Sequence, residues 1–253
     1  MRRARDRLAL RRGALHERRL QDEALRAAGR PELDRWFTER HGSVVLHGPF
    51  AGLRYAPRVL DRVHHLTARL LGSYERELHE VVAVQIERRP PRFVDIGAAD
   101  GYYAVGMATA CPGIDVHAYE IDPVARRVLR ANARENGVRV TVHGPANSRR
   151  LAEHDLDGAF VLSDCEGAEV DILAAEALPA LARATLLVEL HGASGATLRE
   201  RFAPSHTSTA IETRPRDPSE HPELDDAPPE LRAGAVDEMR PGPMTWLLLE
   251  PHP

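Results

Sequence analysis

Two glycines, four positions apart, lie between two apolar stretches of the chain. The segment reads Phe93-Val-Asp-Ile-Gly-Ala-Ala-Asp-Gly-Tyr-Tyr-Ala104. Its pattern predicts a buried strand that ends at Asp95, a tight turn that carries Gly97 and Gly101, and a helix that begins at once. Glu120 closes the next apolar run, residues 114–119. A strand, a glycine turn, a helix, a second strand and an acid in this order are typical of a βαβ unit that holds a nucleotide-like cofactor.

The spacing of the glycines narrows the choice of cofactor. Enzymes that bind dinucleotides place G-x-G-x-x-G around the pyrophosphate, whereas this turn is Gly97-Ala-Ala-Asp-Gly101. Asp100 would repel a pyrophosphate but tolerates a cofactor that bears an ammonium group and a sulfonium. S-adenosylmethionine fits that description. Asp95 can help to orient its amino-acid end, and Glu120 can accept hydrogen bonds from both ribose hydroxyls.

Three acids and a histidine lie at the ends of two later apolar runs. Asp164 ends the run 159–164 and Glu166 lies just beyond it, while Glu189 and His191 end the run 184–191. The two runs are expected to form neighbouring strands, and side chains two positions apart face the same side of a strand. A neutral hydroxyl that accepts a methyl group must lose a proton. The sequence therefore places groups suited to proton transfer at one edge of the sheet.

Three roles are open for these side chains. His191 can be the general base, with a carboxylate that orients its imidazole. Asp164, Glu189 and His191 can instead bind a divalent ion through oxygen and nitrogen ligands. In the third alternative, Glu166 or Glu189 caps a helix or pairs with an arginine from a late, proline-rich loop. Cys165 has no evident activating partner and is interpreted as a packing residue rather than a nucleophile.

Strand-like and helix-like patterns alternate through this part of the chain. They predict an α/β protein with a Rossmann-like, doubly wound, mostly parallel sheet of seven strands, covered on both faces. The predicted strands are 92–97, 114–120, 138–143, 159–164, 184–191, 208–213 and 243–250. The predicted helices are 101–110, 122–136, 167–176 and 195–203.

The chain is predicted to have two regions, an N-terminal extension over 1–90 and a core domain over 91–253. The elements predicted in the extension are a helix (3–30), a second helix (31–40), a hairpin (42–55) and a helical stretch (60–86) that breaks near Gly72. Within the core, residues 214–243 are rich in proline and acids and are expected to form a lid-like loop. The extension and this loop are expected to cover the substrate; the extension can alternatively join two subunits, and the oligomeric state stays open.

Composition excludes several classes of protein. The chain has 253 residues, a formal net charge of −4 and 43% hydrophobic residues, which is ordinary for soluble globular proteins. All 34 basic residues are arginine, so a lysine nucleophile or Schiff base is excluded. The mixed charges of residues 1–40 indicate a solvated helical face rather than a nucleic-acid arm. The two cysteines and the lack of a signal peptide or membrane-spanning run favour a cytoplasmic protein with no membrane partner.

Four segments carry a resemblance to known enzymes: Val94-Asp-Ile-Gly-Ala-Ala-Asp-Gly-Tyr-Tyr103, Tyr119-Glu-Ile-Asp122, Asp164-Cys-Glu-Gly-Ala-Glu169 and Val188-Glu-Leu-His191. With them the chain resembles class I S-adenosylmethionine-dependent methyltransferases and, more narrowly, the FkbM-type family. The resemblance spans about residues 73–191, so it covers the core and leaves out both ends.

The resemblance implies roles for individual residues. Turn residues 97–101 would line the methionine moiety, Glu120 would hold the ribose, and Asp164 would face the reaction centre. FkbM-type turns often carry asparagine where Ala99 stands, and the pair Tyr74-Glu75 resembles one that closes over the cofactor. The predicted cofactor-binding set is Tyr74, Asp95, Gly97, Ala98, Ala99, Gly101, Tyr102, Glu120, Ile121 and Asp164. The predicted catalytic set is Asp164, Glu189 and His191.

The sequence thus predicts an enzyme that transfers a methyl group from S-adenosylmethionine, most simply to an oxygen of a small molecule or glycan. Methylation of a peptide or protein side chain is an alternative. A cofactor-binding protein without catalysis, whose N-terminal helix docks a partner, is another. A nicotinamide-dependent dehydrogenase is disfavoured by the missing third glycine. No metal ligand set is assigned, and a divalent metal stays an alternative without further support.

Overall fold

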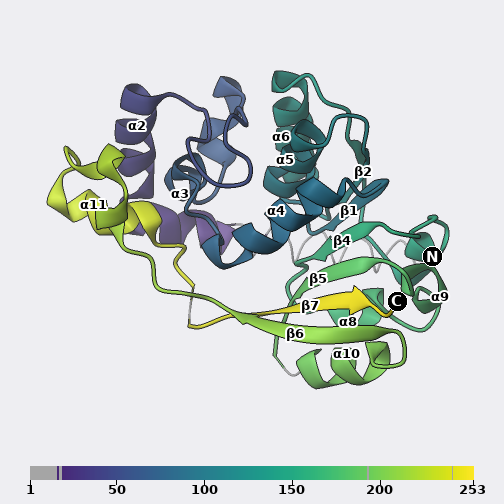
Figure 1. The fold of residues 1–253 in the computed structure, drawn as a ribbon. Helices are drawn as coiled ribbons and strands as arrows, with labels where there is room; N and C mark the ends of the chain where they lie inside the picture. Colours follow the sequence, from purple (N-terminus) through teal and green to yellow (C-terminus); the bar gives the residue numbers. More distant parts are fainter. Residues whose placement is uncertain (1–15, 17–18, 193, 241) are drawn as a thin grey trace.

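The computed structural model describes residues 16, 19–192, 194–240 and 242–253, with a seven-stranded sheet at the centre (Figure 1). The strands are β1 (Arg92–Ile96), β2 (Asp115–Tyr119), β3 (Thr141–His143), β4 (Phe160–Ser163), β5 (Thr185–Glu189), β6 (His206–Glu212) and β7 (Thr245–Pro251). Their order in the sheet is β3-β2-β1-β4-β5-β7-β6. The neighbours from β3 to β5 pair in parallel, whereas β7 runs antiparallel to β5 and β6. The predicted α/β class and mostly parallel sheet of seven strands are confirmed.

The central strands β1, β4 and β5 are buried on both faces because each face of the sheet has its own hydrophobic core. Phe93 and Phe160 stack with ring centroids 5.2 Å apart in one core, and their neighbours Val94 and Val161 are buried in the other. Successive side chains of a strand point to opposite faces. Among the helices that contribute to the first core are α4 (His79–Arg88), α5 (Tyr102–Ala110) and α6 (Pro123–Glu135). Those that contribute to the second are α7 (Ser148–Ala152), α8 (Glu169–Ile172), α9 (Leu178–Leu181) and α10 (Ser194–Phe202).

Helices from both ends of the chain pack together beside the sheet. They are α2 (Arg30–His41), α3 (Leu66–Leu71) and α11 (Pro229–Val236), and each contacts the other two. Figure 1 shows this group at the edge where β6 ends and β7 begins. Because β7 is the one reversed strand, this is also the edge at which β1, β2, β4 and β5 end.

The N-terminal extension differs in detail from the sequence-based expectation. Residues 60–86 were expected to be largely helical, but they belong to four shorter elements: η1 (Pro57–Arg62), α3, η2 (Arg76–Leu78) and α4. The predicted break is confirmed, since Gly72 follows α3 with a φ of +76°. The predicted hairpin is reduced to one antiparallel bridge, between Val44 and Arg54.

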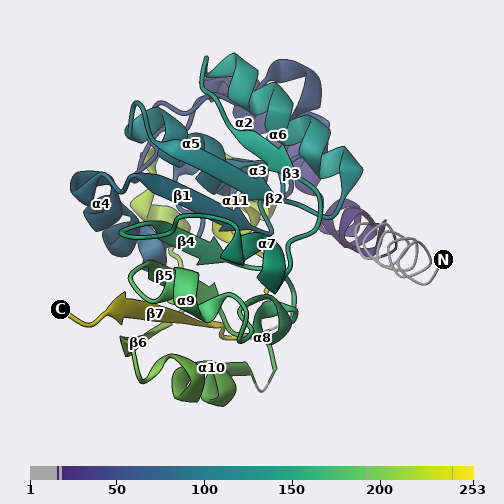
Figure 2. The same cartoon turned by 90° about the vertical axis from the view of Figure 1, so that its right-hand side faces the viewer.

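Two further predictions concern the ends of the chain. Residues 214–243 contain η3 (Pro218–Glu220), η4 (Pro222–Leu224) and α11 rather than an irregular loop. The predicted helix over 3–30 lies mostly outside the described residues; residues 19–27 are helical and lead away from the sheet (Figure 2). Within the described ranges, no helix combines the length and the apolar composition needed to cross a membrane.

Candidate functional site

The predicted site residues come from the turns after β1, β2, β4 and β5. The sheet order changes direction between β1 and β4, and open α/β sheets bind ligands beyond the strand ends at such a point. Gly97 follows β1, Glu120 follows β2, Asp164 follows β4 and His191 lies two positions after β5. The fold therefore brings the two predicted halves of the site, for the cofactor and for chemistry, to one edge.

The turn after β1 leaves no room for a side chain at Gly97. The φ of Gly97 is +90°, and a Cβ there would lie 1.6 Å from the main-chain oxygen of Asp164. The amides of Gly97 and Ala98 both donate to the Tyr119 oxygen, at 2.9 and 3.0 Å. Ala99 adopts a φ of +44°, a left-handed conformation that is uncommon for alanine. The turn is thus held between β2 and β4 by main-chain contacts.

Glu120 is held in place by the backbone on both sides. Its Oε2 accepts a hydrogen bond from the Ala99 amide at 2.8 Å, and its Oε1 accepts one from the Asp122 amide at 2.6 Å. Burial raises the pKa of Glu120. Next to it, the Ile121 oxygen accepts a hydrogen bond from Arg126 at 2.9 Å. Each carboxylate oxygen has a second lone pair, so Glu120 can still accept one ligand hydroxyl through each oxygen.

Asp95 is a buried acid inside β1, one position before its end. The residue is 1% exposed, and its Oδ2 has no hydrogen-bond partner among the described residues. Burial, and then the charge of Glu120, raises the pKa of Asp95 to about 8. A cationic group at the end of β1 would stabilise the ionised form of this carboxyl.

Asp100 does not present a free charge to the turn at Gly97. Its Oδ1 forms a buried ion pair with Arg69 of α3 and accepts a hydrogen bond from the Tyr102 amide at 3.2 Å. This pair weakens the expected repulsion of a pyrophosphate, because Arg69 offsets the charge of Asp100. Gly101, which follows, serves the packing of α5 on α6: a Cβ there would lie 2.7 Å from Cγ of Leu129.

Two predicted cofactor residues, Tyr74 and Tyr102, surround the same arginine. The Arg69 guanidinium lies 4.2 Å from the ring centroid of Tyr74 and 5.4 Å from that of Tyr102. The two rings meet edge to face at 5.5 Å. The hydroxyl of Tyr102 is buried without a hydrogen-bond partner in the described part of the chain. Arg69 itself was not identified from the sequence, where nothing distinguishes it from the many other helical arginines.

The three predicted catalytic residues lie together. The His191 Nε2 atom is 3.9 Å from Asp164 Oδ1 and 3.4 Å from Glu189 Oε2. Glu166 also reaches this nitrogen, with its Oε2 at 3.4 Å. Burial, and then the charge of Glu189, raises the pKa of Asp164 well above its ordinary value. When ionised, a carboxylate with a raised pKa is a stronger base than an ordinary aspartate.

Glu169 orients the imidazole from the opposite side. Its side chain is fully buried, and Oε1 lies 2.9 Å from His191 Nδ1. The same oxygen accepts hydrogen bonds from the amides of Cys165 and Gly167, at 3.2 and 3.1 Å. Hydrogen bonds to Glu166 and Glu169 raise the pKa of His191 to about 10, so the imidazole is protonated at neutral pH in this arrangement. The sequence assigned no role to Glu169 of the DCEGAE segment; in the structure it begins α8.

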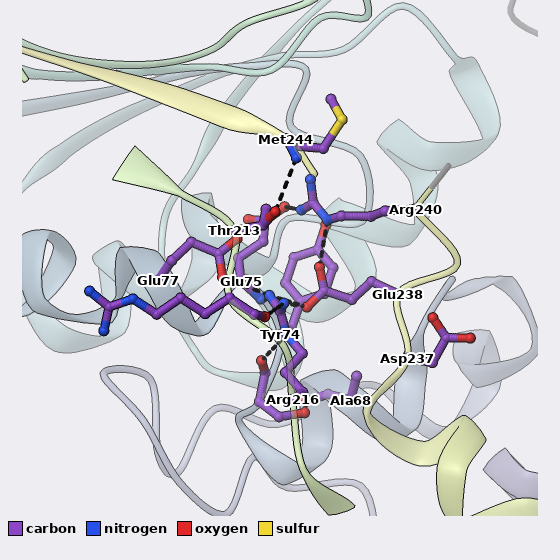
Figure 3. Close-up of polar contacts among 12 residues, drawn as sticks. Ala68, Tyr74, Glu75, Glu77, Thr213, Arg216, Asp237, Glu238, Arg240 and Met244 are labelled. Carbon is purple, nitrogen blue, oxygen red and sulfur yellow. Dashed lines mark hydrogen bonds and ion pairs between the residues drawn. The ribbon is translucent and has the colours of Figure 1, made fainter. Parts of the chain in front are cut away.

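Arg240 connects the late segment of the chain to the strand ends. Figure 3 shows its guanidinium near Glu75 and Glu238. It donates to Glu75 Oε1 and Glu238 Oε2 at 2.8 Å each, and to Glu189 Oε1 at 2.5 Å. Burial raises the pKa of Glu75 to about 7 against the opposing effect of Arg240. Glu189 therefore pairs with an arginine of the late, proline-rich segment, as the third alternative for its role expected, and it also faces His191.

Arg216 makes a second anchor of the same kind (Figure 3). It pairs with Glu77 at 2.8 Å and with Glu238 at 2.7 Å, and all three side chains are largely buried. Arginine–glutamate pairs therefore connect residues 214–243 to the rest of the chain. Glu238, which links Arg216 to Arg240, was missed because it lies in an irregular, proline-rich sequence.

Cys165 lies beside this cluster without an activated thiol. Its Sγ is 3.6 Å from Ser163 Oγ and 3.5 Å from Glu169 Oε1. Burial, and then the charge of Glu169, raises the pKa of the Cys165 thiol well above its ordinary value. Because a thiolate is the reactive form, this environment agrees with a packing role.

No family model matches, and no curated protein matches. Among solved structures, an O-methyltransferase from Bacillus cereus in complex with SAH has a TM-score of 0.44 at 14% identity, over 66% of this chain and 77% of that one. A precorrin-6y C5,15-methyltransferase from Geobacter metallireducens has a TM-score of 0.44 at 15% identity, over 68% and 87%. The O-methyltransferase TomG from Streptomyces achromogenes, in complex with SAM, has a TM-score of 0.42 at 16% identity, over 66% and 76%.

These values are too low to assign the chain to a family or to identify a reaction. The FkbM-type resemblance therefore stays a prediction.

Proposed function

We propose that this protein transfers a methyl group from S-adenosylmethionine to a hydroxyl oxygen of a small molecule or glycan. One observation carries the proposal. The turn at Gly97 and the backbone-held carboxylate of Glu120 lie at the same sheet edge as a cluster of acids around His191. A Cβ at Gly97 would reach the main chain of Asp164, so the cofactor half and the chemical half of the site are in direct contact.

The residues after β1 and β2 fit this cofactor. Each Glu120 oxygen accepts one backbone hydrogen bond and keeps capacity for one ribose hydroxyl. Asp95 has an unpartnered buried oxygen and a pKa raised to about 8, and an ammonium group nearby would stabilise its charge. Arg69 offsets the charge of Asp100, so Asp95 and Glu120, rather than Asp100, support this cofactor.

The residues after β4 and β5 suit the acceptor side of the reaction. The cofactor supplies an electrophilic methyl group on its sulfonium. The chain must hold the acceptor oxygen in line and take up its proton. Asp164 is the group we assign to the proton, because it directly follows β4 next to the turn at Gly97 and burial raises its pKa above the ordinary value. His191, held as an imidazolium by Glu166 and Glu169, would orient Asp164 and Glu189 as a positioning residue.

Calorimetry on the full chain with S-adenosylmethionine and S-adenosylhomocysteine tests the cofactor. We expect Glu120→Ala to weaken both by about tenfold or more, since hydrogen bonds to a charged acceptor are lost. Glu135→Ala, at the exposed end of α6, removes one acid elsewhere and should leave affinity unchanged. The assignment fails if the folded wild-type chain gives no heat of binding with either compound.

A turnover assay tests the acceptor class. A panel of small hydroxyl compounds and glycans is incubated with the chain and the methyl donor, and release of S-adenosylhomocysteine is followed. We expect turnover with a hydroxyl acceptor that Asp164→Asn lowers without loss of cofactor affinity. Turnover with peptide side chains alone would contradict the hydroxyl acceptor and assign the reaction to peptide or protein side chains. Tight cofactor binding without any turnover would favour a cofactor-binding protein without catalysis.

A further inference from the structure

We propose that Asp164, Glu166 and His191 form a binding site for one divalent cation of the Mn²⁺ type. The cation site is inferred from the contacts of these residues alone. Its use in methyl transfer rests on the proposed function. Each residue offers one ligand atom, and these atoms all lie within 4.8 Å of one another.

The distances between the ligand atoms suit a single ion. His191 Nε2 lies 3.4 Å from Glu166 Oε2 and 3.9 Å from Asp164 Oδ1. Neighbouring ligands of an octahedral Mg²⁺ or Mn²⁺ ion, at about 2.1 Å from the metal, are about 3 Å apart, and opposite ligands are about 4.2 Å apart. Both of these separations fall within this interval, and the Asp164 and Glu166 ligand atoms lie within 4.8 Å of each other. Two carboxylates favour Mg²⁺ and Mn²⁺, and the imidazole shifts the preference toward Mn²⁺.

Glu169 orients the histidine as a metal ligand requires. Its Oε1 lies 2.9 Å from His191 Nδ1 and is fixed by the amides of Cys165 and Gly167. With the Nδ1 proton directed at Glu169, the Nε2 atom faces Asp164 and Glu166, and a bound cation would take the place of the Nε2 proton of the imidazolium. A carboxylate behind a ligating imidazole is the usual outer partner in metal sites.

The negative charge of four carboxylates around the imidazole also favours a bound cation. Asp164, Glu166, Glu169 and Glu189 surround His191. Of these four, Glu189 has an arginine partner, Arg240. Asp164 Oδ1 is closed to solvent and has no hydrogen-bond partner among the described residues. An ion bound between Asp164 and Glu166 would provide that partner.

The cluster is open on one side. The Glu166 side chain is 72% exposed, whereas those of His191 and Asp164 are 18% and 27% exposed. Water or an acceptor oxygen can therefore reach an ion at the Glu166 side. There the ion would act as a Lewis acid and lower the pKa of a bound hydroxyl. The ion would lie beside the turn at Gly97, which contacts Asp164.

Electron paramagnetic resonance with MnCl₂ on the full-length chain tests the site. Free Mn²⁺ gives a sharp signal that is lost on binding, so a titration counts sites. We expect one saturable site in the wild-type chain, and an affinity reduced by about tenfold or more in Glu166→Gln and in His191→Gln. Glu166 is exposed, so its substitution tests the site even if His191→Gln fails to fold. Glu176→Gln changes an exposed acid outside the cluster and should bind Mn²⁺ like the wild type.

Two results would overturn the site: no saturable binding below about 1 mM Mn²⁺, or binding that Glu166→Gln and His191→Gln leave unchanged. Repeating the titration with S-adenosylhomocysteine, whose sulfur is uncharged, separates the ion from the cofactor. Mn²⁺ binding at these residues without any cofactor binding supports the metal site and contradicts the proposed function. Cofactor binding without Mn²⁺ binding supports the function and contradicts the site.

Discussion

The α-carbon of Gly97 packs against the main-chain oxygen of Asp164, with no space between them for a side chain. A Cβ on Gly97 would lie 1.6 Å from that oxygen and 2.7 Å from the carbonyl carbon. The amide of Asp164 in turn donates to the Ile96 oxygen at 2.9 Å. The turn after β1 and the acid after β4 are therefore in direct main-chain contact, and we expect a change in either to displace the other.

Gly97→Ala should disrupt this unit. The substitution adds a steric clash with main-chain atoms to the cost of a left-handed conformation, which alone is about 1–2 kcal/mol for a residue with a Cβ. We expect a clear fall in the free energy of unfolding, measured by urea titration, and loss of S-adenosylmethionine binding in calorimetry.

Gly113→Ala is the matched control for this substitution. Its φ is +92°, against +90° for Gly97, but a Cβ there meets nothing within 4 Å. Gly113→Ala should therefore lower the free energy of unfolding only by the cost of the left-handed conformation, and it should still bind S-adenosylmethionine. Equal losses of stability in the two variants would show that the contact with Asp164 is not the cause.

Arg240→Met should destabilise the late segment. The arginine is 18% exposed and pairs with Glu75, Glu189 and Glu238, which are all almost fully buried. Removal of one partner from a buried pair costs about 3–5 kcal/mol, because the other charge is left uncompensated. We expect a loss of this order in urea unfolding, with earlier proteolysis in residues 214–243.

Arg183→Met serves as the control for Arg240. Arg183 pairs with Asp157, but the two side chains are 74% and 65% exposed, and such surface pairs contribute little. Its stability should match that of the wild type. If Arg240→Met is equally neutral, the network in Figure 3 does not hold the segment in place.

A double-mutant cycle on Arg69 and Asp100 should show strong coupling. Both side chains are buried, at 7% and 5% exposure. Asp100→Asn leaves the arginine charge unpaired, and Arg69→Met leaves the carboxylate unpaired, so each single change is costly. In the double variant neither charge is left, and we expect it to lose clearly less stability than the sum of the two single variants. Additive losses in thermal or urea unfolding would argue against the pair.

The core of the fold could be predicted because local patterns determine it. β1 and β4 are apolar runs in the sequence because each strand is buried on both faces. The turn after β1 is indicated by Gly97 and Gly101, two glycines four positions apart. The carboxyl ends of parallel strands meet at one edge, so Asp164 and His191 could be placed near Glu120 without coordinates.

The parts that could not be predicted depend on contacts between distant residues. Arg240 and Glu75 are 165 positions apart, and no local pattern pairs them. The proline-rich segment was expected to lack regular structure, yet Pro218, Pro222 and Pro229 each begin a short helix, where the missing amide of proline costs nothing. The helices α7 and α9 have five and four residues, which is too short for a periodic pattern.

Asp95 should make the stability of the protein fall as pH rises. Burial and the charge of Glu120 raise the pKa of Asp95 to about 8 in the folded chain, from an ordinary value of 3.8. Between these values the folded state holds a proton that the unfolded state has released, so each pH unit upward removes up to about 1.4 kcal/mol. The contribution is complete below pH 4 and is lost by about pH 8.

Asp95→Asn removes this titration and keeps the size of the side chain. We expect the free energy of unfolding of the wild type to fall more steeply than that of Asp95→Asn between pH 5 and 7.5, in urea titrations at several pH values. Groups that titrate in both chains cancel in the difference between the two curves. Parallel curves would mean that Asp95 is already ionised in the folded protein, with its unpartnered oxygen satisfied by another group.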